Sequence, residues 1–244
     1  MMTRGCFVTG TDTGVGKTRI STAMLHLLAE AGEPAAGYKP VAAGLVEIDG
    51  RRVNEDVHAL RVASSVVLSD ADVSPCQLEA ACAPHIAAAM ESRVIDPRHL
   101  LRGALALSHR ARWLVIEGVG GFRVPLGAGF DSADMACDFD LPVVLVVGLR
   151  LGCLNHALLT AEAVRARGLR LAGWVANRID PQMTHADANL MALRQTLGER
   201  YGATCLGVVP WLADPTPAAV AAHLDPTIAR AALQLASQSW EDSQ

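Results

Sequence analysis

The chain has 244 residues, of which 51% are hydrophobic and 4% aromatic, and its formal net charge is -4. This length suits one large α/β domain with a sizeable core of alanine, valine and leucine side chains. The acidic balance argues against a nucleic-acid-binding protein, because such proteins usually carry a basic surplus.

Apolar runs typical of strands alternate with amphipathic segments along the chain. In chain order, the pattern predicts strands at residues 5–9, 35–39, 113–116, 143–147, 171–176 and 206–209. It predicts helices at residues 17–31, 54–63, 97–108, 155–167, 186–201 and 227–236. The segment 64–92 fits a strand, a loop and then a helix.

The predicted strands point to one class of fold. They are unbroken runs of valine, isoleucine and leucine between helices, which indicates burial on both faces of the sheet. We therefore expect a three-layer α/β fold with a doubly wound, mainly parallel sheet. No repeat, linker or low-complexity stretch divides the sequence, so a single domain over residues 1–244 is expected.

The six cysteines include no CxxC pair and no cysteine–histidine cluster with metal-ligand spacing. Reduced thiols are therefore expected, without a zinc site or a disulfide framework. The first strand follows the N-terminus too closely for a signal peptide, and the longest apolar run, residues 141–149, is far shorter than a membrane span. We expect a cytoplasmic protein whose partners are neither membranes nor nucleic acids.

Ligands of doubly wound sheets bind at the carboxyl ends of the strands. Here short polar or glycine-rich segments follow the predicted strands, at residues 10–18, 39–40, 117–118, 148–155, 177–178 and 210–211. The functional site is therefore expected at this edge of the sheet.

The first of these segments lies in the string VTGTDTGVGKT, which resembles a phosphate-binding loop but departs from the common consensus sequence. The common pattern is Gly, four residues and then Gly-Lys-Ser/Thr; Gly16, Lys17 and Thr18 are in place, but Thr11 stands at the first Gly position. Gly14 and Gly16 would let backbone N–H groups approach a phosphate at the positive end of the next helix. We expect Lys17 to reach the β- and γ-phosphates and the Thr18 hydroxyl to ligate Mg²⁺, as in P-loop NTPases.

The amino-acid sequence of the loop distinguishes between families that share it. Partition-type ATPase switches carry a signature lysine early in the loop, where this chain has Asp12. The string TGTDTxVGKT instead resembles the dethiobiotin synthetase family of biotin synthesis. The strings GYKPV, VIEGVGG, LGCLNHALLT, GWVANR and VVPWLAD resemble the same family, in family order, and the matched stretches span residues 7–214.

The resemblance implies an ATP-dependent cyclo-ligase that joins CO₂ to 7,8-diaminononanoate and closes the ureido ring of dethiobiotin. A carbamate and then a carbamic-phosphoric anhydride would form, and ADP and phosphate would be released. The resemblance also implies Mg²⁺ as cofactor, ATP as co-substrate, and a homodimer with the site at its interface.

The resemblance further implies roles for the residues at matching positions. The catalytic residues would be Lys39, Lys17 and Thr13, and the metal ligands Thr18, Asp56 and Glu117. The nucleotide would contact Thr13, Gly14, Val15, Gly16, Lys17, Thr18, Asp56, Glu117, Gly118, Val119, Gly120, Asn177, Arg178, Pro210, Trp211 and Leu212. The substrate would contact Thr13, Lys17, Lys39, Ala43, Gly120, Gly121 and Asn155.

Local chemistry agrees with several of these roles. Lys39 is held extended by Pro40, which would aim its side chain at the site. Glu117 ends a buried strand, where phosphate-loop enzymes hold their metal. Asn155 stands at a predicted helix start, which it can cap. The Asn177 amide can both donate to and accept from the edge of adenine, the role that the resemblance implies.

Two positions depart from the family's usual pattern. Ala43 stands where the family often has a serine that contacts substrate, so that contact is either lost or made by the backbone of Ala43 or Gly44. Gly14 stands where the family commonly has glutamate, which makes this loop more like an ordinary phosphate loop and could shift nucleotide preference.

Other functions are compatible with a phosphate loop. A small-molecule kinase would transfer phosphate to a stable hydroxyl product and would need no bicarbonate. A partition-type ATPase switch is a further alternative, against which Asp12 argues. A glutamine-amidotransferase relative would need a second domain with a cysteine nucleophile, and this chain is too short for one.

Overall fold

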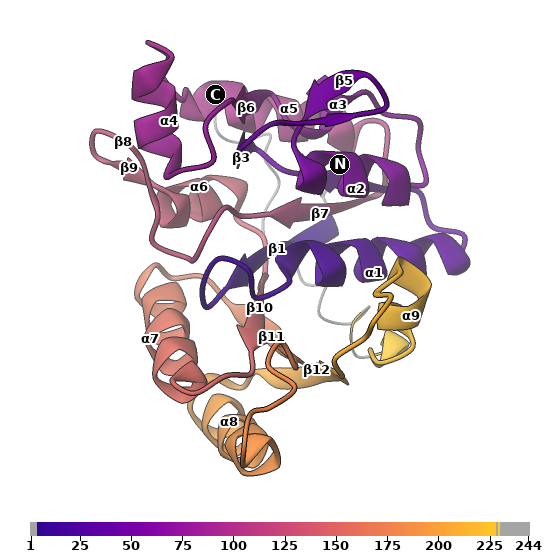
Figure 1. Cartoon of the computed structure of the whole chain (residues 1–244), viewed down its shortest axis with the longest axis vertical. Helices are drawn as coiled ribbons and strands as arrows, with labels where there is room; N and C mark the ends of the chain where they lie inside the picture. The colour runs from indigo at the N-terminus through magenta and orange to yellow at the C-terminus, as the bar shows by residue number, and fades with distance from the viewer. Residues whose placement is uncertain (1–3, 228, 230–244) are drawn as a thin grey trace.

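The computed structural model describes residues 4–227 and 229, which are built around one parallel sheet (Figure 1). This sheet has six strands in the order β12-β11-β10-β1-β7-β2, and every neighbouring pair is parallel. The strands are β1 (Arg4–Gly10), β2 (Ala35–Tyr38), β7 (Trp113–Glu117), β10 (Val143–Gly148), β11 (Leu171–Asn177) and β12 (Thr204–Val209). The predicted parallel α/β sheet is confirmed.

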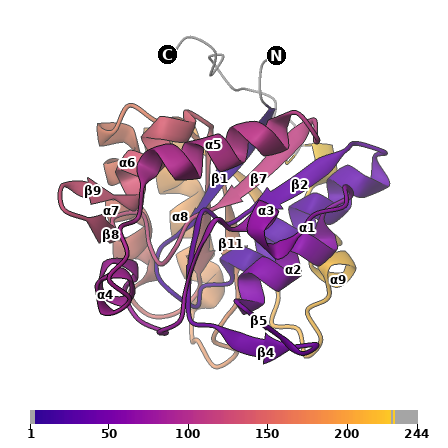
Figure 2. The same ribbon diagram turned by 90° about the horizontal axis from the view of Figure 1, so that it is seen from above.

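Helices cover both faces of the sheet, as the doubly wound prediction requires (Figure 2). One face carries α1 (Lys17–Glu30), α2 (Glu55–Ala63) and α9 (Pro217–Ala221). The other carries α5 (Pro97–Ser108), α6 (Ser132–Phe139), α7 (Cys153–Ala166) and α8 (Ala186–Tyr201). Right-handed crossovers between parallel strands produce this division. Among the described helices, none has the length and apolar character needed to cross a bilayer.

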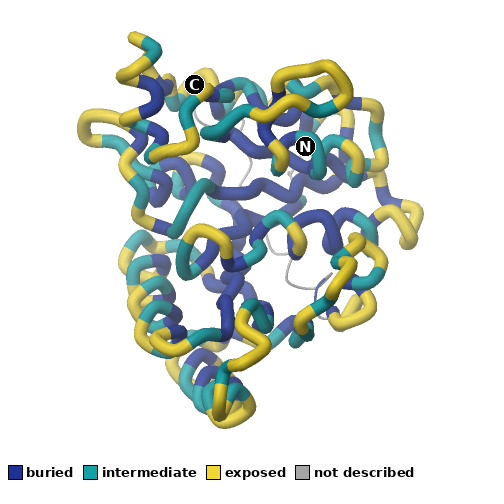
Figure 3. Tube along the Cα trace, in the orientation of Figure 1, coloured by how far each residue is buried: buried dark blue, intermediate teal, exposed yellow. Residues whose placement is uncertain are grey.

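The core lies between these layers, and the central strands are its most buried part (Figure 3). Every residue of β7, β10 and β11 is buried, which explains why these strands read as continuous apolar runs. Aromatic packing joins the sheet to α6, since the ring of Phe139 stacks on Phe7 with centroids 6.3 Å apart and meets the edge of Tyr38 at 6.2 Å. The Tyr38 hydroxyl donates to the carbonyl of Leu100 in α5 over 2.6 Å.

Most predicted elements lie where the sequence pattern places them. The helices predicted at 97–108 and 186–201 have the observed bounds, and the other long elements agree within two residues. The helix predicted at 227–236 lies almost entirely outside the described residues.

The prediction for segment 64–92 is wrong in its first part. Residues 64–69 form no strand; the segment contains α3 (Asp70–Val73), β6 (Cys76–Leu78) and α4 (Pro84–Met90). Val67 is 92% exposed, so its apolar character does not reflect a buried strand. The side chains of Ser64 and Ser65 instead accept hydrogen bonds from the backbone of β2, at Gly37 N and Ala35 N.

Short elements that the sequence pattern did not reveal surround the site edge. They are β3 (Val41–Ala43), which pairs with β6, and the hairpins β4 (Val46–Ile48) with β5 (Arg51–Val53) and β8 (Pro125–Gly127) with β9 (Phe130–Asp131). Helix α6 was also missed, although Asp131 and Asp134 form a capping box at its start. That spacing is a recognisable helix signal in the sequence.

Helix α2 is placed by a cap and by two buried side chains. The Asn54 side chain accepts hydrogen bonds from the backbone N–H groups of Asp56 and Val57, which begins the helix. Val57 and Leu60 are 0% exposed and pack into the core. Because Asp56 lies in the first turn of α2, this packing also sets the position of its carboxylate.

Replacement of Leu60 by alanine should therefore destabilise the protein by about 2–5 kcal/mol, the usual cost of truncating a fully buried leucine. The measurement is the free energy of unfolding in urea. Val62→Ala on the same helix is the matched control, because Val62 is 64% exposed, and it should change stability by less than about 0.5 kcal/mol. Similar losses in the two variants would contradict the proposed docking of α2.

Candidate active site

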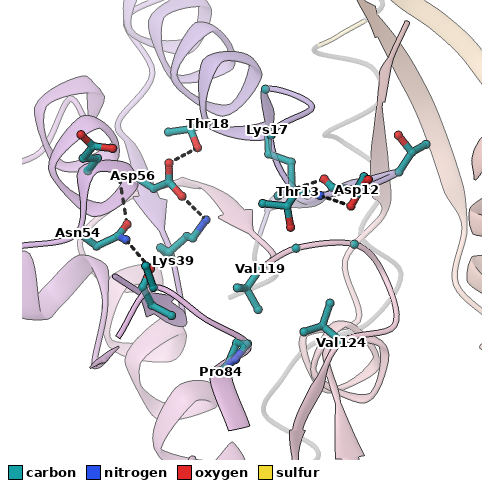
Figure 4. Close-up of a pocket in the computed structure, with 18 of the residues that line it drawn as sticks. Asp12, Thr13, Lys17, Thr18, Lys39, Asn54, Asp56, Pro84, Val119 and Val124 are labelled. Atoms are coloured by element: carbon teal, nitrogen blue, oxygen red, sulfur yellow. Dashed lines mark hydrogen bonds and ion pairs between the residues drawn. The ribbon is translucent and has the colours of Figure 1, made fainter. Parts of the chain in front are cut away.

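A cavity of about 1210 Å³ opens at the carboxyl ends of the central strands. It is lined by the phosphate loop after β1, by Lys39 after β2, by the start of α2 and by the segment that follows β7. Figure 4 shows the side chains of Lys39, Asp56 and Thr18 turned toward one another in this cavity. The predicted site edge and the observed cavity therefore coincide.

The phosphate loop is shaped by two glycines and held by one asparagine. Gly14 and Gly16 have φ of 76° and 92°, in the left-handed region that favours glycine. Helix α1 begins at Lys17 directly after Gly16, so its positive end faces the cavity. Between the glycines, Val15 is buried, and its carbonyl accepts a 2.9 Å hydrogen bond from Asn177 Nδ2.

Lys39 is the centre of the buried charge in the site. Its Nζ lies 2.6 Å from Glu117 Oε1 and 2.7 Å from Asp56 Oδ2. The Lys39 side chain is 4% exposed and that of Glu117 0%, whereas that of Asp56 is 39% exposed. Thr18 Oγ1 lies 2.6 Å from Asp56 Oδ1 and 2.9 Å from Glu117 Oε1, and its single proton can be donated to only one of them at a time.

These contacts decide the charge states of the site. Burial acts to lower the pKa of Lys39, but the carboxylates of Glu117 and Asp56 outweigh it and raise that pKa above its usual value. Burial acts to raise the pKa of Asp56, and the Lys39 ammonium and the Thr18 hydroxyl outweigh it and lower that pKa. Burial and the nearby Lys39 lower the pKa of Lys17 to about 8. At neutral pH the site therefore holds two ammonium groups.

The sequence contains only two lysines, and both lie in this cavity. Their Nζ atoms have different surroundings. That of Lys39 is held between two carboxylates, whereas that of Lys17 donates to the backbone carbonyl of Asp12 over 3.2 Å. The side chain of Lys17 therefore keeps donor capacity for an incoming anion.

The oxygen atoms around Lys39 fit a magnesium ion. Thr18, Asp56 and Glu117 offer hydroxyl and carboxylate oxygens, the ligands that Mg²⁺ prefers. In the part of the chain that the structure describes, Glu117 Oε2 is buried without a hydrogen-bond partner, which leaves it available as a ligand. Within residues 4–227 and 229 there is no group of three or more His, Cys, Asp or Glu side chains suited to a metal. This donor set suits an ion that completes its shell with phosphate oxygens and water.

Comparison with known proteins identifies the family. A family model described as an AAA domain matches residues 4–219. The ATP-dependent dethiobiotin synthetase BioD of Aromatoleum aromaticum is 52% identical over 221 residues, which cover 91% of this chain and 96% of that protein. The protein of the same name from Janthinobacterium sp. is 51% identical over 227 residues, which cover 91% of this chain and 94% of that protein. The chain belongs to the dethiobiotin synthetase family.

Solved structures show how widely the fold is shared. The MinD cell division protein of Aquifex aeolicus superposes with a TM-score of 0.53 at 15% identity, covering 97% of this chain and 98% of that one. The septum site-determining protein MinD of Pyrococcus horikoshii, complexed with Mg-ADP, gives 0.53 at 16% identity and covers 95% of each chain. These likenesses establish the fold of this dethiobiotin synthetase family member, and function depends on the site itself.

Most residues predicted for the site of this dethiobiotin synthetase family member line the cavity. They are Thr13, Gly14, Gly16, Lys17, Thr18, Lys39, Ala43, Asp56, Val119, Gly120, Gly121 and Trp211. The remaining predicted residues are not part of the cavity lining: Val15, Glu117, Gly118, Asn155, Asn177, Arg178, Pro210 and Leu212. Of these, Glu117 is within hydrogen-bond distance of Thr18 and Lys39, and Asn177 holds the phosphate loop.

The prediction that Asn155 caps a helix is wrong. Helix α7 begins two residues earlier, at Cys153, and Gly152 is its N-cap with a left-handed φ of 96°. No side chain caps this helix start, and Asn155 is exposed in its first turn. The glycine allowed the chain to turn into the helix before it reached Asn155.

Two further predicted residues have contacts that the sequence did not reveal. Asn177 is only 2% exposed, with its amide nitrogen on the loop at Val15, and its adenine contact stays a prediction. At Ala43, both the alanine carbonyl and that of Gly44 accept hydrogen bonds from Asn54 Nδ2, at 3.1 and 2.9 Å. The Gly44 N–H donates to Leu78, so this backbone is largely occupied by internal bonds.

Sequence reasoning missed several residues of the cavity wall. Arg19 follows Thr18 in the first turn of α1, and its position directly after the loop was an available signal. Arg123 comes from the segment after β7, and Cys82 from the loop before α4. Arg123 lies two residues after the string VIEGVGG, which was an available signal, whereas Cys82 carried none.

Replacement of Gly16 by alanine should weaken nucleotide binding more than replacement of Gly14. Both positions have a left-handed φ, which costs an L-residue about 1–2 kcal/mol. Only at Gly16 would the new Cβ overlap a neighbour, at 2.2 Å from Asn177 Nδ2, whereas nothing lies within 4 Å at Gly14. We expect the Gly16→Ala variant to lose about tenfold more Mg-ATP affinity by calorimetry, as for one broken hydrogen bond. Equal losses would show that the Asn177 contact is unimportant.

Proposed function

We propose that this protein is an ATP-dependent dethiobiotin synthetase, which joins CO₂ to 7,8-diaminononanoate, closes the ureido ring of dethiobiotin and releases ADP and phosphate. The two relatives at 52% and 51% identity carry that activity in their names. The observation that carries the proposal is the Lys39 ammonium, buried between Asp56 and Glu117 beside a phosphate loop.

The proposed reaction has three steps. One amine of the substrate attacks CO₂ and loses a proton, which gives a carbamate. A carbamate oxygen attacks the γ-phosphorus of ATP, the bond to the β–γ bridging oxygen breaks, and ADP leaves. The second amine then attacks the carbon of the mixed anhydride, loses a proton and expels phosphate as the five-membered ring closes.

The first two steps require neighbouring cations. A carbamate and a triphosphate are both anions, and the ammonium groups of Lys17 and Lys39 reduce their repulsion and the charge that develops at the transferred phosphoryl group. The same cations disfavour protonation of the attacking amine, which must be neutral to capture CO₂. Thr13 lines the cavity next to the loop glycines, where its hydroxyl would contact the carbamate or the γ-phosphate.

Thr18, Asp56 and Glu117 would hold Mg²⁺, whose chemistry is to neutralise the phosphate oxygens and to orient them for transfer. The ring closure itself needs little assistance from side chains. The second amine is tethered beside the anhydride, and effective molarities for such reactions reach about 10⁵–10⁸ M. The protein's task in that step is to keep water out and to hold the chain of the substrate.

The nucleotide and the substrate would occupy different parts of the cavity. Trp211 marks one wall, where the base would lie near Asn177, Arg178, Pro210 and Leu212. Ala43, Gly120 and Gly121 also line the cavity, and we place the diamine against them.

The active unit is proposed to be a homodimer. Asn155 is exposed and outside the cavity of its own chain, so a contact with the substrate carboxylate would have to come from a second copy. Near it, Leu151 and Leu159 are 92% and 59% exposed, which suits an apolar surface covered by a partner.

A turnover assay separates this function from a small-molecule kinase. Phosphate release should require the diamine, bicarbonate, ATP and Mg²⁺ together, and labelled carbon from bicarbonate should enter a ring product. A kinase would form a phosphorylated product without bicarbonate. Phosphate release that does not depend on bicarbonate would refute the cyclo-ligase.

Lys39→Ala should lower kcat by about 10²–10³-fold, because it removes a charge that stabilises the transferring phosphoryl group. ATP binding should largely persist, since Lys17 and the loop N–H groups remain. Steady-state kinetics and calorimetry measure the two effects, and thermal unfolding checks that the Glu117 carboxylate, left unpaired, has not unfolded the chain. Lys39→Arg is the matched control and should retain more activity; full activity of Lys39→Ala would exclude the proposed role.

A further inference from the structure

Asp12 places a carboxylate in the wall of a cavity that is suited to phosphate. An acid at this position should repel a triphosphate, because like charges at short range disfavour binding. Its neighbours in the sequence are the loop residues Thr13 to Thr18, which also line the cavity except for Val15. The contacts of Asp12 offer an explanation for its presence.

Asp12 has partners on three sides. Its Oδ1 accepts a 2.7 Å hydrogen bond from the backbone N–H of Thr13, and its Oδ2 forms an ion pair with the Arg150 guanidinium. Its backbone carbonyl accepts the 3.2 Å hydrogen bond from Lys17 Nζ. Figure 4 shows the side chains of Asp12, Thr13 and Lys17 close to one another at the loop. The Thr13 N–H and the Arg150 guanidinium lower the pKa of Asp12, so the carboxylate is charged at neutral pH.

Arg150 comes from a different part of the sheet. It lies between the end of β10 and Gly152, the residue that starts α7. In the same region Leu149 N donates to Asn177 O over 2.7 Å, and the Asn177 side chain holds the loop at Val15. The side chains of Asn177 and Arg150 therefore attach the phosphate loop to the ends of β11 and β10.

We propose that Asp12 and Arg150 form a positioning pair for the phosphate loop. Arg150 neutralises the carboxylate and holds Asp12 in place. Asp12 in turn fixes the loop backbone, since its carboxylate accepts the Thr13 N–H and its carbonyl accepts from the Lys17 ammonium. The inference rests on the proposed function only in taking a nucleoside triphosphate as the ligand of this loop.

The pair is half-exposed, with side chains 41% and 46% accessible for Arg150 and Asp12. Such pairs contribute little to the overall free energy of folding. A variant of either residue should therefore fold normally, and its effect should appear in the placement of the loop. Small displacements of binding groups are sufficient to weaken recognition strongly.

The direction of the change in Mg-ATP affinity in Asp12→Asn distinguishes a positioning role of Asp12 from a purely electrostatic one. If Asp12 acts only through its negative charge, Asp12→Asn should tighten Mg-ATP binding by removing repulsion. If it positions the loop, Asp12→Asn should weaken binding by about tenfold, within the range measured for coupled residues in contact. Calorimetry with Mg-ATP and Mg-ADP, without diamine or bicarbonate, measures this. Tighter or unchanged binding would overturn the proposal.

Variants of Arg150, alone and combined with Asp12→Asn, complete a double-mutant cycle. Arg150→Gln should weaken Mg-ATP binding about as much as Asp12→Asn, and the double variant should be no weaker than either single one, because both disrupt one pair. Arg150→Lys should recover most of the affinity, since a lysine can still pair with Asp12. Arg52→Gln, which breaks an exposed pair with Glu79 outside the cavity, is the control and should bind normally. Fully additive losses would contradict the pair.

A spectroscopic readout follows from the lysine content. Protein labelled with ¹³C-lysine should give one set of signals for Lys17 and one for Lys39, because the sequence has no other lysine. In Asp12→Asn and Arg150→Gln the Lys17 signals should move and those of Lys39 should not. Unmoved Lys17 signals would overturn the proposal. These binding and spectroscopic tests need no ring closure. The positioning pair can therefore be supported even if the turnover assay refutes the proposed function, and it can be refuted even if that assay succeeds.

Discussion

The structure of the site depends on one buried ammonium group. Lys39 lies between the carboxylates of Glu117 and Asp56, and the charges of Lys39 and Glu117 are buried, which would be strongly unfavourable for either of them alone. Without the ammonium, the two carboxylates would repel each other, and without them the ammonium would lose a proton in so buried a place. The ends of β2 and β7 must therefore come together for the buried charges of Lys39 and Glu117 to be tolerated, and the start of α2 adds the second carboxylate, Asp56.

The phosphate loop obeys a second constraint, which is geometric. Its backbone turns through left-handed conformations at Gly14 and Gly16 and leaves no space for a side chain at Gly16, where Asn177 fills the volume. Asn177 is thus an internal support of the loop as well as a residue at a strand end. The loop and the charged cluster meet at Thr18, whose hydroxyl contacts both carboxylates.

The fold alone does not select the chemistry. MinD proteins share the arrangement of strands and helices at 15–16% identity, yet their names describe cell division and septum placement. The chemistry of this chain depends on its strand ends, which carry an acid in the loop and a lysine after β2 that is held between carboxylates. The family is established by relatives of about half identical sequence over nearly the whole length. The cluster of Lys39, Asp56 and Glu117 supplies the charges that the proposed reaction of this family needs.

The sequence by itself determined the parallel α/β fold, the order of its long elements and the phosphate loop, because these depend on local periodicity and on short motifs. It also indicated Lys39 and Glu117 through their places at strand ends, and Asp56 through the resemblance to the family. Only the tertiary structure decided which groups pair: that Lys39 lies between both carboxylates, that Asn177 supports the loop, and that Arg150 reaches Asp12 across 138 positions of sequence. Local patterns carry no information on such contacts, since they arise when strands distant in sequence align their ends. The start of α7 was misplaced for a different, local reason: the left-handed turn at Gly152 begins the helix before the cap expected at Asn155.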